Sequence, residues 1–384
     1  MQQNELNALR GEIDAIDDQL VALFKDRMNV ASRVAAYKQE NGLPVLAPGR
    51  ERELLARVSA QAGEDLADYT EALFRTLMAV SRSYQNACSG IPSKSYEDVK
   101  TALANTPDLF PQRAMVACQG IEGAYSQIAC DSIFKAPTIL YFKSFENVFR
   151  AVESGMCQYG ILPIENSTAG SVNTTYDLMR RHNFSIVRAA RLKVSHNLLA
   201  KYGTKQENIR KIFSHEQAIS QCASFLSTLQ DVKLTVVENT AMAAKLVSES
   251  ERTDVAALSS RFCADHYNLE TLKANIQDQD NNYTRFICIS KNPEIYPGAD
   301  RTSFMMTLPH KPGSLYNILS KFYALGINLR KLESRPLPDR EFEFMFYFDI
   351  EASVYAPEME NLFRDLENEA EEFRYLGTYS EVIC

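Results

Sequence analysis

The chain has 384 residues, with 41 Lys and Arg residues against 49 Asp and Glu residues, and a net charge of −8. This length accommodates two or three domains, and a hydrophobic content of 45% allows each of them a packed core. The acidic balance argues against a nucleic-acid-binding protein, which needs a basic face. It leaves open an enzyme that acts on small anions, because a few arginines can set the charge of a pocket.

The eight cysteines form no CxxC pair and no Cys/His group with the spacing of a zinc site. This scatter predicts no metal site and is typical of a reducing compartment. The N-terminal residues MQQNELNALR contain no apolar signal core, and no stretch approaches the roughly 20 apolar residues of a membrane span. We therefore expect a cytoplasmic protein that binds neither a membrane nor nucleic acid.

Residues 5–88 predict an all-helical segment. Apolar residues recur there at close to heptad spacing, at Leu6, Leu9, Ile13, Ile16, Leu20, Leu23, Val30 and Val34. No proline interrupts residues 6–40, so we expect one helix roughly 50 Å long at 1.5 Å per residue. Two shorter helices, one from near Arg50 and one over residues 65–87, cannot cover it. We expect it to pack against a second subunit, which makes the protein at least a homodimer.

Several polar residues of these helices share faces. Arg27 and Lys38 are eleven residues apart, which is three helical turns, and Ser81 and Gln85 are four apart. If the bundle gathered them with Arg50, it would form a site for a dianion. The spacing alone favours the ordinary alternative, in which they are solvated surface charges.

The segment nevertheless resembles the all-helical chorismate mutases over residues 5–88. The matching positions are Arg10, Arg27, Lys38, Arg50, Glu51, Ser81 and Gln85. The resemblance implies an intertwined dimer in which Arg10 reaches the partner's site. It also implies a cofactor-free rearrangement of chorismate to prephenate, for which the enzyme holds a compact conformer and stabilises charge on the breaking ether oxygen.

The same resemblance assigns roles to these residues. The arginines bind the two carboxylates, Lys38 and Gln85 donate to the ether oxygen, and Glu51 binds the ring hydroxyl. The chain departs from the family at Ala47, where an aspartate is frequent. If the backbone amide makes that contact, activity survives; if the side chain makes it, mutase activity is in doubt.

After a polar linker over residues 91–112, the pattern changes to β-rich runs alternating with helical stretches. The runs are residues 115–117, 139–142, 159–162, 211–213, 234–237, 255–258 and 286–289. This alternation predicts an open α/β sheet, in which ligands bind just past the strand ends. Polar residues lie at such places, at Glu165, Asn166, Ser214, His215 and Gln217.

Several stretches of this segment resemble prephenate dehydratases, over residues 113–291. They are QGIEGAYS at 119–126, PIENS at 163–167 with GSV at 170–172, SHEQA at 214–218 with Gln221-Cys222, TAMAA at 240–244, AALSS at 256–260 and NYTRF at 282–286. Finding them in this order, at the family's spacing, is much more specific than any one of them. The resemblance implies a two-lobed fold like that of periplasmic binding proteins.

The implied reaction removes carbon dioxide and the 4-hydroxyl of prephenate together and yields phenylpyruvate. Thr284 is implied to sit at the departing hydroxyl as a hydrogen-bonding or relay group, and Arg285 to hold a carboxylate. The candidate cleft residues are Glu165, Asn166, Ser167, Thr168, Ser214, His215, Gln217, Thr284, Arg285 and Phe286. Singly, Ser214 and Thr168 could only cap helices and His215 could be a core histidine.

A second linker, residues 292–301, precedes a strand–helix–strand–strand–helix–strand pattern over 302–384, which predicts a ferredoxin-like α+β domain. Phe342, Phe344, Phe346 and Phe348 alternate along one expected strand. The segment resembles an ACT regulatory domain, which implies L-phenylalanine as effector, bound at a subunit interface. The implied effector residues are Gly313, Ser314, Leu315, Glu333, Ser334 and Arg335. The alternative is a dimerisation domain without a ligand.

Together these segments predict a bifunctional enzyme of phenylalanine biosynthesis without cofactor or metal, with domains at 1–90, 113–291 and 302–384. Two alternatives remain. The chain could be an amino-acid sensor without catalysis, because solute-binding proteins share the two-lobed pattern. It could also be a dehydratase whose helical segment only dimerises, a reading that Ala47 favours and that Lys38 and Gln85 oppose.

Overall fold

The computed structural model describes residues 2–88, 92–338, 340 and 343–384. They form two compact units, of which the first comprises Met1–Glu97, Leu308–Gly326 and Tyr355–Glu372. The second comprises Asp98–Thr307, Ile327–Val354 and Phe373–Cys384. No helix of the described ranges combines the length and the apolar character that crossing a membrane requires.

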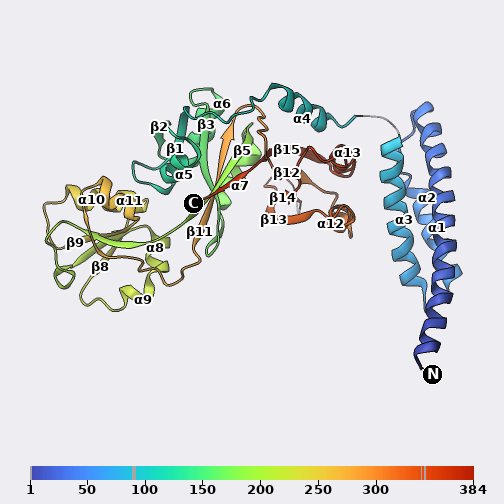
Figure 1. The fold of residues 1–384 in the computed structure, drawn as a ribbon, viewed down its shortest axis with the longest axis horizontal. Helices are drawn as coiled ribbons and strands as arrows, with labels where there is room; N and C mark the ends of the chain where they lie inside the picture. Colours follow the sequence, from blue (N-terminus) through green and yellow to red (C-terminus); the bar gives the residue numbers. More distant parts are fainter. Residues whose placement is uncertain (1, 89–91, 339, 341–342) are drawn as a thin grey trace. The chain divides into compact units, whose positions relative to one another are not determined.

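The N-terminal part of the first unit is the predicted set of three helices (Figure 1). They are α1 (Gln2–Glu40), α2 (Pro48–Ala62) and α3 (Ala67–Cys88). Gly42 takes a positive φ of 62° just after α1, and Pro48 occupies the first turn of α2, where its missing N–H costs nothing. Helix α3 packs against both α1 and α2.

Helix α1 buries little of its apolar face within the chain. Its buried apolar residues are Met28, Ala31 and Ala35, all in its C-terminal half. The large apolar residues of α1 that stay exposed are Leu6, Leu9, Ile13, Ile16, Leu20, Val21, Leu23, Phe24, Val30, Val34 and Tyr37. A stripe of this length is unusual on a monomer surface and marks an interaction face.

The first unit also contains two helices from the C-terminal part of the sequence, α12 (Ser314–Ala324) and α13 (Met359–Glu369). Lys321 on α12 pairs with Asp365 of α13 at 3.1 Å and with Glu369 at 3.2 Å. Helix α12 begins after Gly313, whose positive φ of 86° favours a residue without a side chain. One short helix, α4 (Lys94–Asn105), lies in the linker that follows α3 and precedes β1 in the sequence.

The second unit is built on a seven-stranded sheet in the order β16-β5-β11-β3-β1-β2, with β4 paired to β3. Its strands are β1 (Met115–Gln119), β2 (Thr138–Phe142), β3 (Tyr159–Asn166), β4 (Gly170–Ser171), β5 (Ser185–Lys193), β11 (Tyr283–Ser290) and β16 (Glu381–Ile383). Strand β11 returns from the second lobe and runs antiparallel between β3 and β5. The associated helices are α5 (Tyr125–Ile133), α6 (Phe145–Glu153) and α7 (Asn173–Arg181).

A five-stranded sheet in the order β10-β6-β9-β7-β8 forms the second lobe. Its strands are β6 (Asn197–Ala200), β7 (Lys211–Ser214), β8 (Lys233–Val236), β9 (Val255–Ser259) and β10 (Glu270–Lys273). The helical elements of this lobe are η1 (Gln206–Asn208), α8 (Glu216–Gln221), α9 (Ala223–Leu226), α10 (Thr240–Glu249) and α11 (Arg261–His266), with α10 against β9 (Figure 1). The chain crosses between the sheets twice, from β5 to β6 and from β10 to β11, as a two-lobed domain requires.

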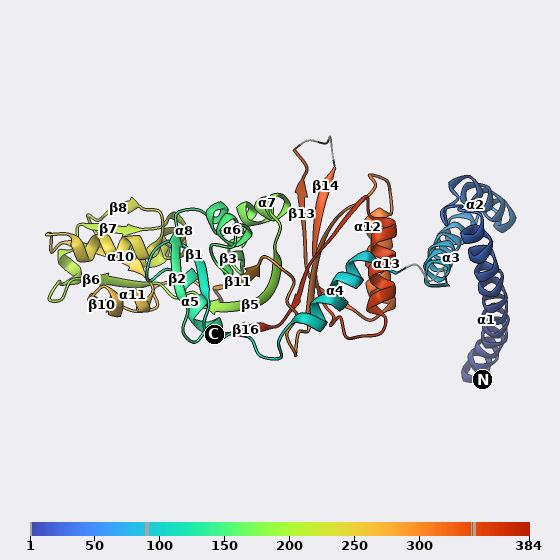
Figure 2. The ribbon, with the colours of Figure 1, turned by 90° about the horizontal axis from the view of Figure 1, so that it is seen from above.

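A third sheet, in the order β13-β14-β12-β15, belongs to the same unit. It comprises β12 (Arg301–Thr307), β13 (Asn328–Pro336), β14 (Phe344–Glu351) and β15 (Glu372–Tyr379), with β13 and β14 as long antiparallel neighbours (Figure 2). Phe346 is half-buried and Phe348 buried, whereas Phe342 lies outside the described residues.

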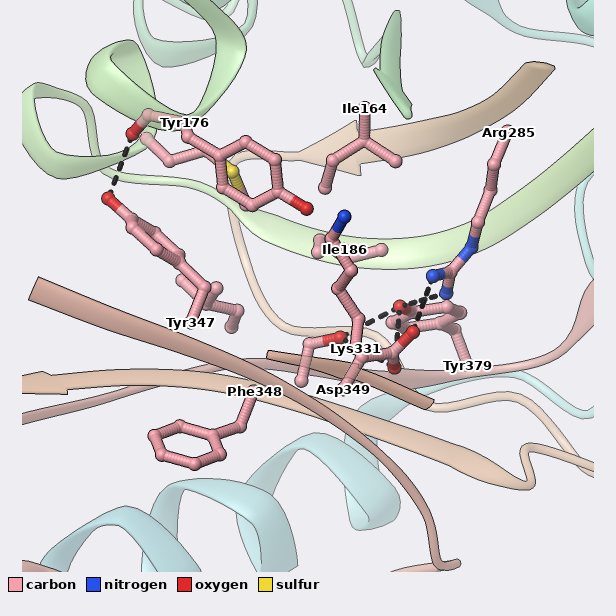
Figure 3. A pocket seen from close by; sticks show the side chains of 12 residues that line it. Ile164, Tyr176, Ile186, Arg285, Lys331, Tyr347, Phe348, Asp349 and Tyr379 are labelled. Atoms are coloured by element: carbon pink, nitrogen blue, oxygen red, sulfur yellow. Dashed lines mark hydrogen bonds and ion pairs between the residues drawn. The ribbon is translucent and has the colours of Figure 1, made fainter. Parts of the chain in front are cut away.

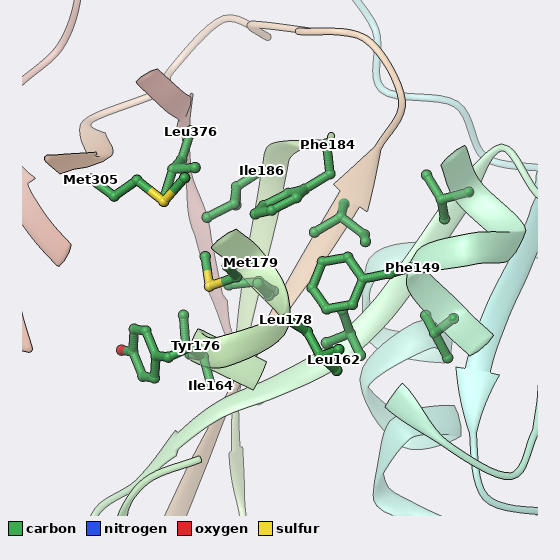
Figure 4. Packing of buried hydrophobic residues seen from close by; sticks show 14 of the residues in the cluster. Phe149, Leu162, Ile164, Tyr176, Leu178, Met179, Phe184, Ile186, Met305 and Leu376 are labelled. Atoms are coloured by element: carbon green, nitrogen blue, oxygen red, sulfur yellow. The ribbon is translucent and has the colours of Figure 1, made fainter. Parts of the chain in front are cut away.

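The first and third sheets share one hydrophobic core (Figure 4). Phe149, Leu162 and Ile186 of the first lobe are in the same buried cluster as Met305 and Leu376 of the third sheet. Burying such side chains stabilises the fold by about 1.5–3 kcal/mol each. The α/β segment and the third sheet are therefore joined by packing as well as by sequence.

Close backbone approach between the two sheets makes one glycine irreplaceable. A Cβ atom at Gly377, which has a φ of 149°, would lie 2.0 Å from the carbonyl oxygen of Ile186. We expect Gly377→Ala to destabilise the second unit by more than the ~1–3 kcal/mol of ordinary overpacking, because backbone atoms must move. Urea unfolding followed by circular dichroism measures the loss. Gly298→Ala is the matched control, since Gly298 also has a positive φ but nothing within 4 Å of its added Cβ; equal losses would contradict the expectation.

Candidate active sites

The strand pair β3–β11 carries the sequence motifs of the α/β segment. In its register Thr284 faces Asn166 and Arg285 faces Glu165. Because side chains alternate along a strand, the first pair points to one face of the sheet and the second pair to the other. The motif residues therefore divide into two clusters that share a backbone.

On the first face, Asn166 is the central residue. Its Oδ1 accepts the backbone N–H groups of Thr168 at 3.0 Å and Ala169 at 2.8 Å. Backbone N–H groups can only donate, so the orientation of the amide is fixed. Its Nδ2 consequently donates, to Asn282 Oδ1 at 2.7 Å and to Thr284 Oγ1 at 2.9 Å.

These bonds belong to a closed ring of four side chains, Asn166, Asn282, Gln221 and Thr168, which we call the amide ring. Asn282 Nδ2 donates to Gln221 Oε1 at 3.0 Å, and Gln221 Nε2 donates to Thr168 Oγ1 at 2.9 Å. Thr168 Oγ1 in turn donates to Asn166 Oδ1 at 2.8 Å, which closes the ring. Gln221 is the last residue of α8 in the second lobe, so the ring also joins the two lobes.

The sequence did not single out Asn282 and Gln221 as site residues. Both lie in stretches that carry the resemblance, since Asn282 opens NYTRF and Gln221 precedes Cys222. The only signal for them was this position, because a single amide side chain in a loop or at a helix end has no periodicity to distinguish it.

The remaining predicted residues of this face lie beside the ring or at the start of α8. Ser167 Oγ donates to the Asn281 carbonyl at 2.6 Å and accepts the Tyr283 N–H at 2.8 Å. Ser214 is fully buried and donates to the Leu258 carbonyl at 3.0 Å. His215 is half-exposed, and its Nδ1 caps α8 by accepting the N–H of Gln217, which is exposed. The structure thus makes His215 a helix cap and not a core histidine.

On the opposite face, Arg285 is only 7% exposed and is surrounded by acceptors (Figure 3). Its Nη1 lies 2.5 Å from Asp349 Oδ2 and 3.4 Å from Glu165 Oε1. Its Nε lies 3.1 Å from Glu381 Oε1, and its Nη2 donates to Tyr379 Oη at 2.9 Å. Phe286, the next residue, is buried in the core and contributes no polar group.

The charges of this second cluster, which we call the arginine cluster, offset one another. Arg301 pairs with Glu381 at 2.9 Å, and Lys331 of β13 pairs with Glu165 at 3.3 Å. Burial lowers the pKa of Arg285, but Tyr379 and Asp349 more than compensate, so that the pKa lies well above the usual arginine value. Arg285, Lys331 and Asp349 line a cavity of about 20 Å³, enough for one water molecule. Arg285 is therefore a permanent cation whose donors point at the third sheet.

Two of the predicted effector residues on β13 contact the first lobe. Arg335 makes a bidentate pair with Asp177 of α7, at 2.9 and 3.0 Å. Glu333 bonds to Ser171 of β4, whose hydroxyl also accepts from Lys331 at 2.7 Å. Ser334, between them, is exposed.

The other three predicted effector residues lie at the start of α12. Gly313 precedes the helix, Ser314 begins it, and Leu315 is half-buried. The hydroxyl of Ser314 is buried and has no hydrogen-bond partner among the described residues. An unpaired buried hydroxyl is costly and is a group that a ligand can satisfy.

In the helical segment, Ser81 and Gln85 come together on α3. Gln85 Nε2 donates to Ser81 Oγ at 3.3 Å, while Gln85 Oε1 is buried without a partner in the described part of the chain. Arg27 Nη1 donates to the Leu77 carbonyl at 3.4 Å, and burial lowers its pKa.

The other predicted mutase residues lie further out. Lys38 Nζ donates to the Val45 carbonyl at 2.6 Å, in the turn that leads to Ala47 and α2. Arg10 and Arg50 are exposed. Glu51 pairs with Arg82, a residue that the sequence did not indicate, because a single arginine on a helix face is usually solvated.

Comparison with known proteins supports both segments. A chorismate mutase type II family model matches residues 9–86, and a prephenate dehydratase family model matches residues 116–294. A bifunctional chorismate mutase/prephenate dehydratase of Aquifex aeolicus is 30% identical over 380 residues, which cover 99% of each chain.

Two solved structures resemble 69% of the chain. One is the prephenate dehydratase of Arthrobacter aurescens in complex with L-Phe, with 26% identity, a TM-score of 0.64 and 90% of that chain covered. The other, GqqA, is described as a quorum quenching acylase and has 30% identity, a TM-score of 0.63 and 97% coverage. Because the Aquifex relative matches from end to end and both family models occur in this order, the chain belongs to the bifunctional chorismate mutase/prephenate dehydratase family.

Proposed function

We propose that the two activities of this family occupy separate sites in the chain. The mutase site lies in residues 1–90, the dehydratase site in residues 113–291, and a regulatory segment in residues 302–384. The observation that carries the proposal is the amide ring, which presents Thr284 from the strand pair where the two lobes meet. No residue of the helical segment takes part in that ring.

In the dehydratase reaction, carbon dioxide leaves prephenate and the electrons of the broken C–C bond move into the six-membered ring of the substrate. The substrate ring then expels its 4-hydroxyl. The departing oxygen must receive a proton or a strong hydrogen bond. Thr284 Oγ1 accepts a bond from Asn166 Nδ2, so its own proton remains available for the substrate. Thr284 is thus a hydrogen-bond donor to the leaving hydroxyl.

The substrate carboxylates then bind along the cleft, near Ser167, Ser214, His215 and Gln217. The hydroxyl of Thr168 is used within the amide ring, so Thr168 shapes the cleft more than it binds substrate. The surroundings of Arg285 and Glu165 favour a role in holding β3 and β11 against the third sheet over direct contact with a carboxylate.

For the mutase site we propose Arg27, Lys38, Ala47, Arg50, Glu51, Ser81 and Gln85 of one subunit with Arg10 of another. The unpaired Gln85 Oε1 and the partly desolvated Arg27 support a site that a single subunit leaves incomplete. The exposed apolar stripe of α1 supports an at least dimeric protein, because a second copy of the helix could cover it. The eight unpaired cysteines are compatible with a cytoplasmic location.

We further propose that residues 302–384 form an ACT domain that binds L-phenylalanine and lowers dehydratase activity. The βαββαβ element order, the unpaired Ser314 hydroxyl and the similarity to a dehydratase solved with L-Phe support this. Residues 313–315 and 333–335 are the candidate effector contacts. Phenylalanine must bind an inactive state more tightly, since equal affinity for two states shifts nothing.

The role of Thr284 is tested by an isosteric change. We expect Thr284→Val to lower the rate of phenylpyruvate formation by at least about 100-fold, because the donor to the leaving hydroxyl is lost. Prephenate should accumulate from chorismate, as followed by chromatography of quenched reactions. Thr284→Ser keeps the hydroxyl and should retain most activity. Normal turnover by the valine variant would remove Thr284 from the mechanism.

Separate sites imply separable losses. We expect Lys38→Ala to lower the mutase rate by about 10²–10³-fold, since one donor to the ether oxygen is gone, and to leave the dehydratase rate unchanged. The two rates are measured with chorismate and with prephenate as substrate. Lys25→Ala, at an exposed position of the same helix, is the control. Equal loss of both activities would contradict separate sites.

Regulation should depend on the contacts of β13 with the first lobe. Lys331→Met removes the ion pair with Glu165 and the bond to Ser171 while it keeps the aliphatic stem. We expect saturating phenylalanine to inhibit this variant less completely, while calorimetry shows nearly unchanged phenylalanine binding. Lys291→Met, at an exposed site, is the control. Unchanged inhibition would show that these contacts carry no signal.

A further inference from the structure

A buried histidine adjoins the amide ring and has no role in the mechanism so far. His196 is 3% exposed and lies on the crossing from β5 to β6. Its backbone is held at both ends, because its N–H donates to Gln277 Oε1 at 3.0 Å and its carbonyl accepts the Ile276 N–H at 2.9 Å. Its Nε2 lies 2.9 Å from Gln221 Oε1, and its Nδ1 has no partner in the described ranges.

The amide ring dictates which nitrogen of His196 carries the proton. The backbone N–H groups of Thr168 and Ala169 fix the orientation of Asn166, and each bond of the ring fixes the next. Gln221 must therefore present its oxygen, which already accepts from Asn282, to the histidine. An oxygen can only accept, so His196 is the donor through Nε2–H.

The bare Nδ1 agrees with this assignment. A neutral imidazole has one N–H and one lone pair, and an unpartnered buried lone pair costs less than an unpartnered buried N–H. Burial lowers the pKa of His196 by more than the hydrogen bond to Gln221 raises it, which keeps the imidazole neutral. Protonation at Nδ1 would place a second donor where no acceptor lies.

The orientation of the amide ring matters where Asn166 contacts Thr284. Asn166 Nδ2 faces Thr284 Oγ1, so the threonine oxygen accepts and its proton points elsewhere. If the amides were reversed, an oxygen would face Thr284 and would capture that proton. The hydroxyl could then no longer donate into the cleft. The direction of the bonds, beyond their number, decides whether Thr284 is a donor to substrate.

We propose that His196 is a positioning residue for the dehydratase reaction, whose Nε2–H anchors Gln221 and so keeps the amide ring closed across the two lobes beside Thr284. This inference rests on the proposed function of Thr284 as a donor to the leaving hydroxyl. His196 never touches substrate; it acts through Gln221, Asn282 and Asn166. Since Gln221 comes from the second lobe, His196 also stabilises the arrangement of the lobes in which the ring is closed.

The test compares two amide variants of the full chain that differ in reach. His196→Gln places its side-chain nitrogen near the position of Nε2, where it can still donate to Gln221. His196→Asn places its nitrogen near the position of Nδ1, which is too short to reach Gln221. We measure kcat and KM for prephenate, the mutase rate with chorismate and the melting temperature of both.

We expect His196→Asn to lower kcat by about 10- to 100-fold with a small change in KM, as for a misplaced donor. His196→Gln should regain most of kcat, and both variants should keep the mutase rate. Equal kcat values for the two variants, whether normal or reduced, would overturn the proposal, because a merely structural histidine has no reason to distinguish them.

A double-mutant cycle with Gln221→Met keeps the proposal testable if either histidine variant is poorly folded. Gln221→Met removes the acceptor of His196 with nearly unchanged volume. If His196 acts through Gln221, the double variant His196→Asn/Gln221→Met should lose no more kcat than Gln221→Met alone. Additive losses would overturn the proposal. The Thr284→Val variant distinguishes failure of the proposed role of Thr284 from failure of the inference on His196. Normal turnover by Thr284→Val would reject the role of Thr284 itself. An inactive Thr284→Val together with a fully active His196→Asn would reject only the inference.

Discussion

The register between β3 and β11 is the constraint on which the rest of the dehydratase segment depends. It places Asn166 beside Thr284 on one face and Glu165 beside Arg285 on the other. A slip of one residue would exchange the faces and bury the Thr284 hydroxyl among carboxylates. The arginine cluster opposes such a slip, because moving Arg285 would leave the buried carboxylate of Asp349 without its cation, at a cost of about 3–5 kcal/mol. The position of Asn166 and Thr284 on one face is thus held by ion pairs on the other.

The sequence was sufficient for the elements with strong periodicity and for the family motifs. The long α1 and the runs that became β1, β3, β9 and β11 were all predictable from apolar spacing. Strand β4, of two residues, was missed, and so were β5, β6, β10 and β16. Arg188 and Arg191 interrupt the apolar pattern of β5, and β6, β10 and β16 have only three or four residues, too few to show alternation.

The candidate sites were only partly predictable for a different reason. Motifs indicate which residues matter, but not which face of a strand they share or what they contact. Arg285 and Thr284 are neighbours in NYTRF, and the resemblance placed both near substrate, yet the fold turns them to opposite faces. Asn282 and Gln221 are 61 residues apart, and only the return of β11 from the second lobe brings their amides together. Such long-range pairs of polar side chains leave no local signal.

Strand β16 has a consequence for how the protein is made. Residues 381–383 complete the sheet that begins at Met115, and Glu381 is the shared partner of Arg285 and Arg301. While the ribosome is still adding the preceding 265 or so residues, the edge of β5 stays open and the guanidinium groups lack this counterion. The helices α1–α3 are made long before, but they share their unit with α12 and α13, so this unit too is completed only by the C-terminal part of the chain. A chaperone that protects the open edge of β5 would therefore be needed over most of the synthesis of the chain.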